Sequence, residues 1–244
     1  MSNYIFFANN NEPDRPIFRV FGIERLLQIF SNRELILVRP KKWDDPFENF
    51  ILNSRATLET GEHITLTFEN SLYGQCWTQH KENDGMWRIY SPQKNGVKVR
   101  TTARKLRESL ADVVESPELT AFIGKVQYKR NKDLTAMVSD RVRMQRKIFG
   151  ATGRGHAESL LFKRDAFSHE KEIRLIYTGA PSEGETDLFS FAVDPHALFE
   201  EVVFDPRMDT ALCEIYEKHL KSIGFPGKIK RSQLYEVPNI TVRA

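Results

Sequence analysis

The sequence predicts an α+β fold, in which a mixed, largely antiparallel sheet is flanked by helices. About eight segments have the length and apolar pattern of strands, and three or four have the spacing of amphipathic helices. The two kinds of segment do not alternate regularly along the chain, which disfavours a doubly wound parallel sheet. Because there is no internal repeat and no obvious linker, we expect residues 1–244 to form a single domain.

The elements of the N-terminal half follow from hydrophobic periodicity. Strands are expected over residues 17–21, 34–38, 64–68, 73–78 and 96–100. Apolar side chains at helical spacing predict helices over residues 22–30 and 102–114, and residues 85–90 fit a helical turn. The strict alternation over 96–100 indicates a strand at an edge of the sheet or half-buried in it.

The C-terminal half continues the same mixture. Strands are expected over residues 125–129, 170–177, 188–193, 200–205 and 228–235. Asp133 is suited to cap a helix that runs to about Phe149, because a carboxylate can accept from the free N–H groups of the first turn. A last helix is expected from Asp209 to Gly224. Its apolar positions predict five inward side chains, which are Leu212, Ile215, Tyr216, Leu220 and Ile223.

The composition indicates a cytoplasmic protein without a membrane partner. Hydrophobic residues make up 40% of the chain and charged residues 28%, and the two cysteines suggest neither a disulfide framework nor a zinc cluster. No apolar run approaches the ~20 residues that span a bilayer, and the N-terminus lacks the apolar region of a signal peptide.

Positive charge gathers between Lys129 and Arg154. This segment has eight basic residues against Asp133 and Asp140, so it carries +6, and the rest of the chain carries −3 of the total of +3. Such a run forms either a solvated helix face or a surface that follows a phosphate backbone. In the second interpretation RNA or DNA is a partner, and the candidate contacts are Arg141, Arg143, Arg146, Lys147 and Arg154.

Familiar catalytic motifs are missing, so any chemistry depends on carboxylates, arginines and aromatic residues. There is no phosphate-binding GxxxxGK[ST] loop, no GxGxxG, no HExxH and no GxSxG, and no metal site is expected from the scattered histidines. Four clusters remain, each with a structural interpretation beside a functional one. They are W-D-D-P-F-E at 43–48, C-W-T-Q at 76–79, M-W-R-I-Y at 86–90 and E-K-E-I-R at 170–174.

The last cluster places Glu170, Glu172 and Arg174 on one face of the strand expected there, and Lys171 on the other. Two carboxylates two residues apart on one strand face repel each other unless a cation or a ligand compensates their charge. We expect Arg174 to be the ion-pair partner that allows the two carboxylates to coexist. The cluster is then either a structural ion pair or the acidic part of an active site.

These motifs, in this order, resemble a bacterial family of unknown function, number twenty-nine seventy-one. Its pattern is N-D-P-F-E, C-F-S, M-W-x-x-Y-A and W-x-x-E-x-E-x-R, and the resemblance runs from about Phe18 to Phe204. The departures are mild, with Asp44, Thr78, Ser91 and Phe167 in place of Asn, Ser, Ala and Trp. The first motif of the family is reduced to residues 18–21, which leaves the role of Arg19 open.

The order of the motifs is also similar to the Arg–Ser–Glu arrangement of ADP-ribosyltransferases, which use NAD as a substrate. The resemblance implies that Arg19 binds the NAD pyrophosphate and that Thr78 positions the glutamate and the nicotinamide ribose. It implies that Glu172 grips this ribose and stabilises the oxocarbenium-like state, while Glu170 orients or deprotonates the acceptor. Nicotinamide or adenine would stack on aromatic residues, for which the candidates are Trp77, Trp87 and Tyr90.

Three functions therefore remain open. The first is an NAD-dependent ADP-ribosyltransferase-like toxin or defence effector, with nucleic acid as an acceptor and an antitoxin or other regulatory protein as a partner. The second is a Mg²⁺-dependent nuclease that gathers Asp44, Asp45, Glu48, Glu170 and Glu172 around the metal, with Lys163 or Lys171 near the phosphate. The third is a non-catalytic nucleic-acid-binding or regulatory module that uses the basic segment.

Overall fold

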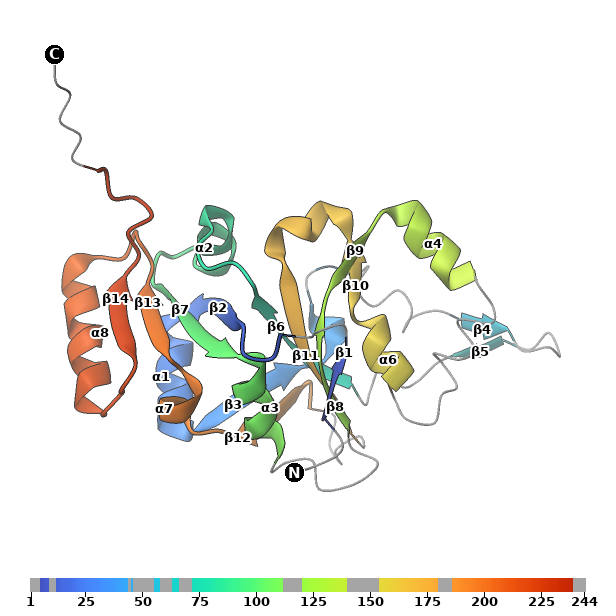
Figure 1. Cartoon of the computed structure of the whole chain (residues 1–244), viewed down its shortest axis with the longest axis horizontal. Coiled ribbons are helices and arrows are strands. Elements are labelled where there is room, and N and C mark those ends of the chain that lie inside the picture. The colour runs from blue at the N-terminus through green and yellow to red at the C-terminus, as the bar shows by residue number, and fades with distance from the viewer. Residues whose placement is uncertain are drawn as a thin grey trace, which may run out of the picture.

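A ten-stranded sheet runs through the molecule and carries most of its core (Figure 1). The computed structural model describes residues 5–8, 12–43, 45, 55–57, 63–65, 72–111, 120–139, 154–179 and 186–238. The strands of the sheet are β1 (Ile5–Ala8), β2 (Pro16–Gly22), β3 (Glu34–Val38), β6 (Leu72–Thr78), β7 (Gly96–Thr102), β8 (Thr120–Lys125), β11 (Glu172–Thr178), β12 (Leu188–Ala192), β13 (Glu201–Phe204) and β14 (Lys228–Arg231).

The sheet is mixed and largely antiparallel, as predicted. Its order is β1-β8-β11-β6-β2-β7-β13-β14, with β12 paired to β3 and β3 paired to β6. Within it only β1–β8 and β13–β14 are parallel, among the strands that the structure describes. Two small sheets stand apart from it, one of β4 (Arg55–Thr57) with β5 (His63–Thr65) and one of β9 (Gln127–Lys129) with β10 (Phe162–Arg164).

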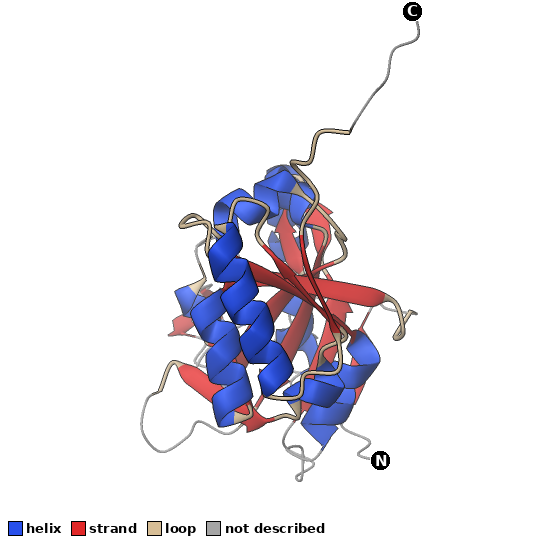
Figure 2. Ribbon diagram, turned by 90° about the vertical axis from the view of Figure 1, so that its left-hand side faces the viewer, coloured by secondary structure: helices blue, strands red, loops and turns tan. Residues whose placement is uncertain are grey.

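Helices cover the sheet, and Figure 2 shows several of them packed across its face. They are α1 (Ile23–Asn32), α2 (Asp84–Tyr90), α3 (Ala103–Ala111), α4 (Asn131–Ser139), α6 (Arg154–Ser159), α7 (Pro195–Leu198) and α8 (Thr210–Ser222), with the 3₁₀ helices η1 (Pro40–Lys42) and η4 (Asp165–Glu170). The main core joins one face of the sheet to α1, α3 and α8, with Leu26, Leu106 and Leu220 fully buried against it. No helix in the described part of the chain is long and apolar enough to cross a membrane.

The sheet opens between β2 and β6, and this opening positions the candidate site. The described part of these two strands shares a single residue pair, Phe18 with Thr78. Along the rest of its length β2 pairs with β7, from Pro16 opposite Thr102 to Gly22 opposite Gly96. β6 pairs instead with β11 on its other side. The two halves of the sheet therefore separate at the centre of the molecule, where β2, β6 and β11 lie next to one another (Figure 1).

Two predicted strands are placed differently by the structure. β7 is not at an edge, because it lies between β2 and β13 and six of its seven residues are buried. Strand pairing covers both edges of β7, and on the face that alternation had assigned to solvent Lys98 is covered by the Trp87 ring of α2 and by Glu82. The strand expected over 170–177 begins only at Glu172, because Glu170 ends η4 and Lys171 adopts a left-handed backbone with φ of 43°.

The helix expected from Asp133 begins two residues earlier, at Asn131, and Asp133 lies in its first turn, where it pairs with Arg130 at 2.8 Å. Its predicted continuation beyond Ser139 falls outside the described residues. In α8, Leu212 and Ile215 are 42% and 58% exposed, so their predicted inward orientation is wrong. Leu220 is buried and Tyr216 and Ile223 pack against the core, as predicted, and Cys213 is buried beside them.

Candidate active site

Two adjoining cavities, of ≈ 270 and ≈ 400 Å³, occupy the opening between β2 and β6. Five residues line both of them, which are Arg19, Cys76, Tyr90, Glu170 and Glu172. The smaller cavity is closed by residues of β2 together with Trp77, Thr78 and Met86. The larger one extends toward Trp43, Lys163 and Phe167. The segments that carry the separate sequence motifs therefore meet at these two cavities.

Arg19 supplies a positive charge that has no counter-ion among the residues that the structure describes. It lies on β2 and is partly exposed at the cavity wall, where its guanidinium is 5.6 Å from the centre of the Phe21 ring. It makes no hydrogen bond or ion pair with any residue that the structure describes. Burial lowers its pKa to about 10, so it remains ionised at neutral pH. A partly buried guanidinium without a counter-ion in the described part of the chain has the chemistry to bind an anion by two parallel hydrogen bonds.

Thr78 ties the three central strands together at the site. It ends β6 and lies opposite Phe18 of β2 on one side and opposite Glu172 of β11 on the other. Its hydroxyl donates to the backbone oxygen of Glu170 at 2.6 Å and accepts from the N–H of His80 at 3.1 Å. Thr78 therefore fixes the end of η4, and with it the place from which the Glu170 side chain reaches the cavity.

Glu170 and Glu172 are buried carboxylates, 5% and 4% exposed, that share a counter-ion. The Lys163 ammonium lies 2.9 Å from Glu172 Oε1 and also donates to Glu170 Oε2. Arg174, which is fully buried, binds Glu172 Oε2 through Nε at 2.7 Å and Nη2 at 2.6 Å. The expected ion pair of Arg174 with Glu172 is confirmed, and Lys171 is exposed, as its turn away from the carboxylates implied.

Lys163, on β10, contacts both carboxylates, and the sequence motifs did not predict this contact. From the sequence, Lys163 was expected only near the phosphate of a nuclease substrate. The strand β10 has three residues and pairs with β9, about thirty-five positions earlier, at Lys163 opposite Tyr128. The Tyr128 hydroxyl in turn accepts from the N–H of Glu172 at 2.8 Å. The small sheet of β9 and β10 thus holds the acidic pair from outside the main sheet.

The two carboxylates differ in their affinity for protons. Burial, and then the neighbouring charge of Glu172, raise the pKa of Glu170 to about 7, although Lys163 opposes the shift. Burial also acts against ionisation of Glu172, but Arg174, Glu170 and Lys163 together hold the pKa of Glu172 well below its usual range. At neutral pH one carboxylate is therefore ionised, and the other can gain or lose a proton.

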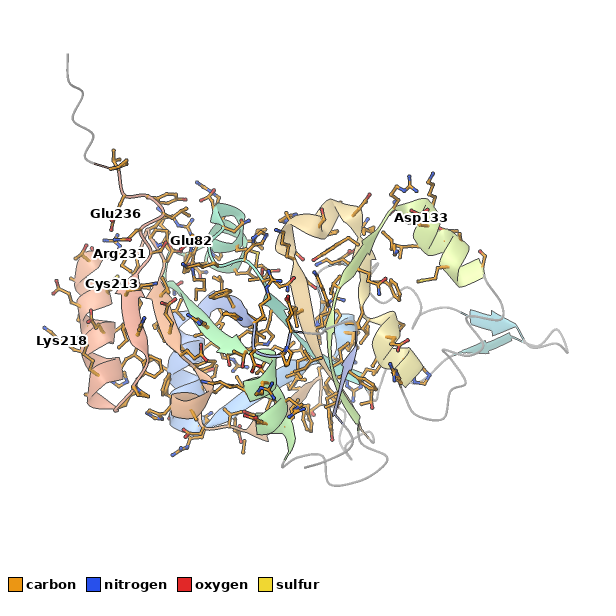
Figure 3. The ribbon with its side chains drawn as sticks, viewed as in Figure 1. Glu82, Asp133, Cys213, Lys218, Arg231 and Glu236 are labelled. Atoms are coloured by element: carbon orange, nitrogen blue, oxygen red, sulfur yellow. The ribbon has the colours of Figure 1, made fainter. Side chains whose placement is uncertain are left out.

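The three aromatic candidates lie in different places. Tyr90 lines both cavities, and its hydroxyl is 3.5 Å from Glu170 Oε1. Trp77 borders the smaller cavity but is 2% exposed, and its indole N–H donates to Gln75 at 2.9 Å. Trp87, in α2, lines neither cavity, because it is packed in the core and donates to Glu82 at 2.6 Å. Glu82 lies beside α2 (Figure 3). Of these three candidates, Tyr90 is the most exposed, at 38%, and it offers the most ring surface to a ligand.

The candidate nucleic-acid contacts are mostly beyond what the structure describes. Arg141, Arg143, Arg146 and Lys147 lie outside the described residues. Arg154 is at the start of α6, exposed, and pairs with Glu158 at 2.9 Å.

The proposed metal ligands are only partly placed. Asp44 and Glu48 lie outside the described residues, and Asp45 pairs with Arg164 at 2.8 Å. Within the described ranges no three His, Cys, Asp or Glu side chains gather as a metal site. The Lys163 ammonium stands between Glu170 and Glu172, where a divalent ion would need to bind both.

Comparisons with known proteins give one family and one group of structures. Structures of Thermus sp. 2.9 DarT are similar to this chain at low sequence identity. The complex with ADP-ribosylated ssDNA is 13% identical, with 93% of this chain and 97% of that chain covered and a TM-score of 0.41. The complex with NAD⁺ is 12% identical, with 93% and 98% covered and a TM-score of 0.41.

No curated protein matches the sequence. The model of the family described as Protein of unknown function (DUF2971) matches residues 86–175, and over this range it confirms the family resemblance that the motifs predicted.

Proposed function

We propose that this protein is an NAD-dependent ADP-ribosyltransferase whose active site is the opening between β2 and β6. The observation that carries the proposal is that one cavity is lined by a guanidinium without an acidic partner among the described residues and by two buried carboxylates of unlike proton affinity. Arg19 comes from β2, Glu172 from β11 and Glu170 from the end of η4 just before it.

The charges of the cavity favour a ligand with a diphosphate. Lys163 and Arg174 neutralise the two glutamates, so the charge of Arg19 remains in excess. A diphosphate offers the planar guanidinium two oxygens at once, which is the arrangement that arginine binds most strongly. The volumes of the two adjoining cavities, ≈ 270 and ≈ 400 Å³, are in the range of small-molecule sites.

The carboxylates fit the chemistry of a glycosidic C–N bond. When the bond between C1′ of the nicotinamide ribose and the ring nitrogen breaks, the electron pair leaves with nicotinamide and positive charge develops on the sugar. An ionised carboxylate held in place stabilises this charge where it forms, which is the role proposed for Glu172. The acceptor bonds to C1′ as nicotinamide leaves, and Glu170 takes the proton that the acceptor gives up in this step.

The acceptor in this proposal is nucleic acid, either RNA or DNA. Its support is the excess of +6 in the segment from Lys129 to Arg154, which suits a phosphate backbone. Modification of nucleic acid would make the protein a toxin or defence effector, for which a neutralising protein partner is expected. Transfer to RNA or DNA should weaken steeply as salt is added, while release of nicotinamide into water should not.

The test is nicotinamide release from NAD⁺ by the purified wild-type protein and by Glu172→Gln. Losing a fixed charge that stabilises the transition state lowers kcat by about 10²- to 10³-fold in comparable sites. Glu201→Gln is the matched control, because Glu201 is also a buried carboxylate on the sheet, paired with Lys230 at 2.8 Å and away from the cavities. Circular dichroism establishes that each variant is folded. Wild-type protein that neither binds nor cleaves NAD⁺, with or without RNA and DNA, contradicts the proposal.

A further inference from the structure

We infer that Lys163 is a positioning residue, whose ammonium group holds Glu170 and Glu172 in separate roles and leaves Glu170 as the one able to accept a proton. The inference rests on the proposed function, and it assigns a part in the reaction to a residue outside the motifs. Three features of the site support it. They are the contacts of the ammonium group, the position of Glu170 Oε1, which is not bound to Lys163, and the effect of the lysine charge on the two carboxylates.

The ammonium of Lys163 is enclosed on all the sides that the structure describes. It is within hydrogen-bonding distance of Glu170 Oε2, 2.9 Å from Glu172 Oε1 and 4.6 Å from the centre of the Phe167 ring. The residue is 7% exposed. A buried ammonium with these contacts has little freedom, so it fixes how far apart the two carboxylates stand.

The contacts divide the four carboxylate oxygens unequally. Glu172 has both oxygens in ion pairs, one with Lys163 and one with Arg174. Glu170 uses Oε2 for Lys163, its Oε1 lies 3.5 Å from the Tyr90 hydroxyl, and the two carboxylates also share a hydrogen bond. Because Glu170 also lines both cavities, Oε1 is the oxygen best placed to take a proton from an acceptor. Glu172 is left to act through its charge.

The balance of charge depends on the same lysine. Arg174 contacts Glu172, and Lys163 is a cation that contacts both carboxylates. The other titratable groups around Glu170 are Tyr90 from α2, Tyr128 from β9, Arg19 from β2, Cys76 from β6 and His169 on its own helix η4. None of them carries a full charge within hydrogen-bonding distance of Glu170. Without Lys163 the two carboxylates would repel, and Glu170 would hold its proton to higher pH.

The experiment compares Lys163→Met and Lys163→Arg with the wild type in two measurements. The first is the pH dependence of nicotinamide release. The second is the titration of Glu170 by carboxyl NMR in protein labelled with ¹³C-glutamate, which needs no activity. Lys98→Met is the matched control, because Lys98 is 5% exposed and pairs with Glu82 at 3.1 Å but lines neither cavity.

In Lys163→Met we expect the titration midpoint of Glu170 and the acid limb of the pH–rate profile to rise together by about one to three units. Nicotinamide release at pH 7 then falls about tenfold or more and recovers at higher pH. Lys163→Arg retains the charge and should keep both values near those of the wild type, and Lys98→Met should move neither. A purely structural lysine would lower stability without moving the profile.

Two results would overturn the inference. One is a midpoint of Glu170 that does not move in folded Lys163→Met. The other concerns Lys163→Arg, which retains the charge, and it decides the matter if Lys163→Met does not fold. It is a shift of more than one pH unit in the acid limb of the pH–rate profile of Lys163→Arg. If the wild-type protein releases no nicotinamide, the proposed function fails, and the NMR titration still decides whether Lys163 controls the acidic pair.

Discussion

Replacing Arg19 with methionine should weaken NAD⁺ binding and stabilise the protein at the same time. The two effects have one cause, because the guanidinium lacks an acidic partner among the described residues and is held ready for a ligand. Methionine is of similar length and removes the charge. A residue that supports only the fold would show the opposite sign for stability.

The size of each effect follows from the surroundings of Arg19. Burial lowers its pKa from 12.5 to about 10, which corresponds to at most about 3 kcal/mol against folding at every pH below 10. Contact of the side chain with solvent in the cavity reduces this to about 1 kcal/mol. The melting temperature should rise by about 2–4 °C for each kcal/mol gained. Losing a hydrogen-bonded charge on the diphosphate costs about 1.5–3 kcal/mol, or about 10- to 150-fold in Kd.

Isothermal titration with NAD⁺, ADP-ribose and nicotinamide, together with thermal unfolding, measures both effects. The loss of affinity should appear for NAD⁺ and ADP-ribose, which carry the diphosphate, and not for nicotinamide. Arg104→Met is the control, since Arg104 binds Asp14 at 2.8 Å on the surface and lines neither cavity. If Arg19→Met binds ADP-ribose as tightly as the wild type, or melts at a lower temperature, the reasoning about Arg19 is refuted.

Three further predictions concern the neighbours of Arg19. Thr78→Val should lower the free energy of unfolding by about 1–3 kcal/mol, because the backbone oxygen of Glu170 loses its donor. A denaturant titration in which the variant is as stable as the wild type would contradict this. Nicotinamide release should rise with a midpoint near pH 7 as Glu170 loses its proton, and a rate independent of pH between 5 and 9 would remove Glu170 as the base. Trp87→Phe loses the hydrogen bond to Glu82, so its free energy of unfolding should fall by about 0.5–1.5 kcal/mol while its NAD⁺ affinity stays unchanged. A weaker NAD⁺ affinity would instead place Trp87 at the ligand.

The sequence predicted the strands that build the site more fully than the site itself. β2, β6 and β11 are apolar runs whose length and period identify them, and their order along the chain suggested a shared active site. Periodicity does not reveal where a strand begins. Glu170 continues the alternation of β11 but belongs to η4, because Lys171 turns the backbone and Thr78 holds the oxygen of Glu170 from another strand.

Contacts between distant segments explain what the sequence left out. Lys163 was not linked to the carboxylates because β10 is short and its partner β9 is far away along the chain. Trp87 belongs to an aromatic motif that resembles a ligand-stacking site, yet its indole ring packs in the core and its N–H donates to Glu82. In α8 the helical period marks an apolar surface, but only the packing of the sheet decides that Cys213 and not Ile215 faces inward.

A crystal structure of the protein with a non-hydrolysable NAD analogue tests the central claim most directly. We predict the diphosphate within bidentate hydrogen-bonding distance of the Arg19 guanidinium and the nicotinamide ribose against Glu172, in the opening between β2 and β6. An analogue that binds elsewhere, or an empty cavity at saturating concentration, would contradict the account.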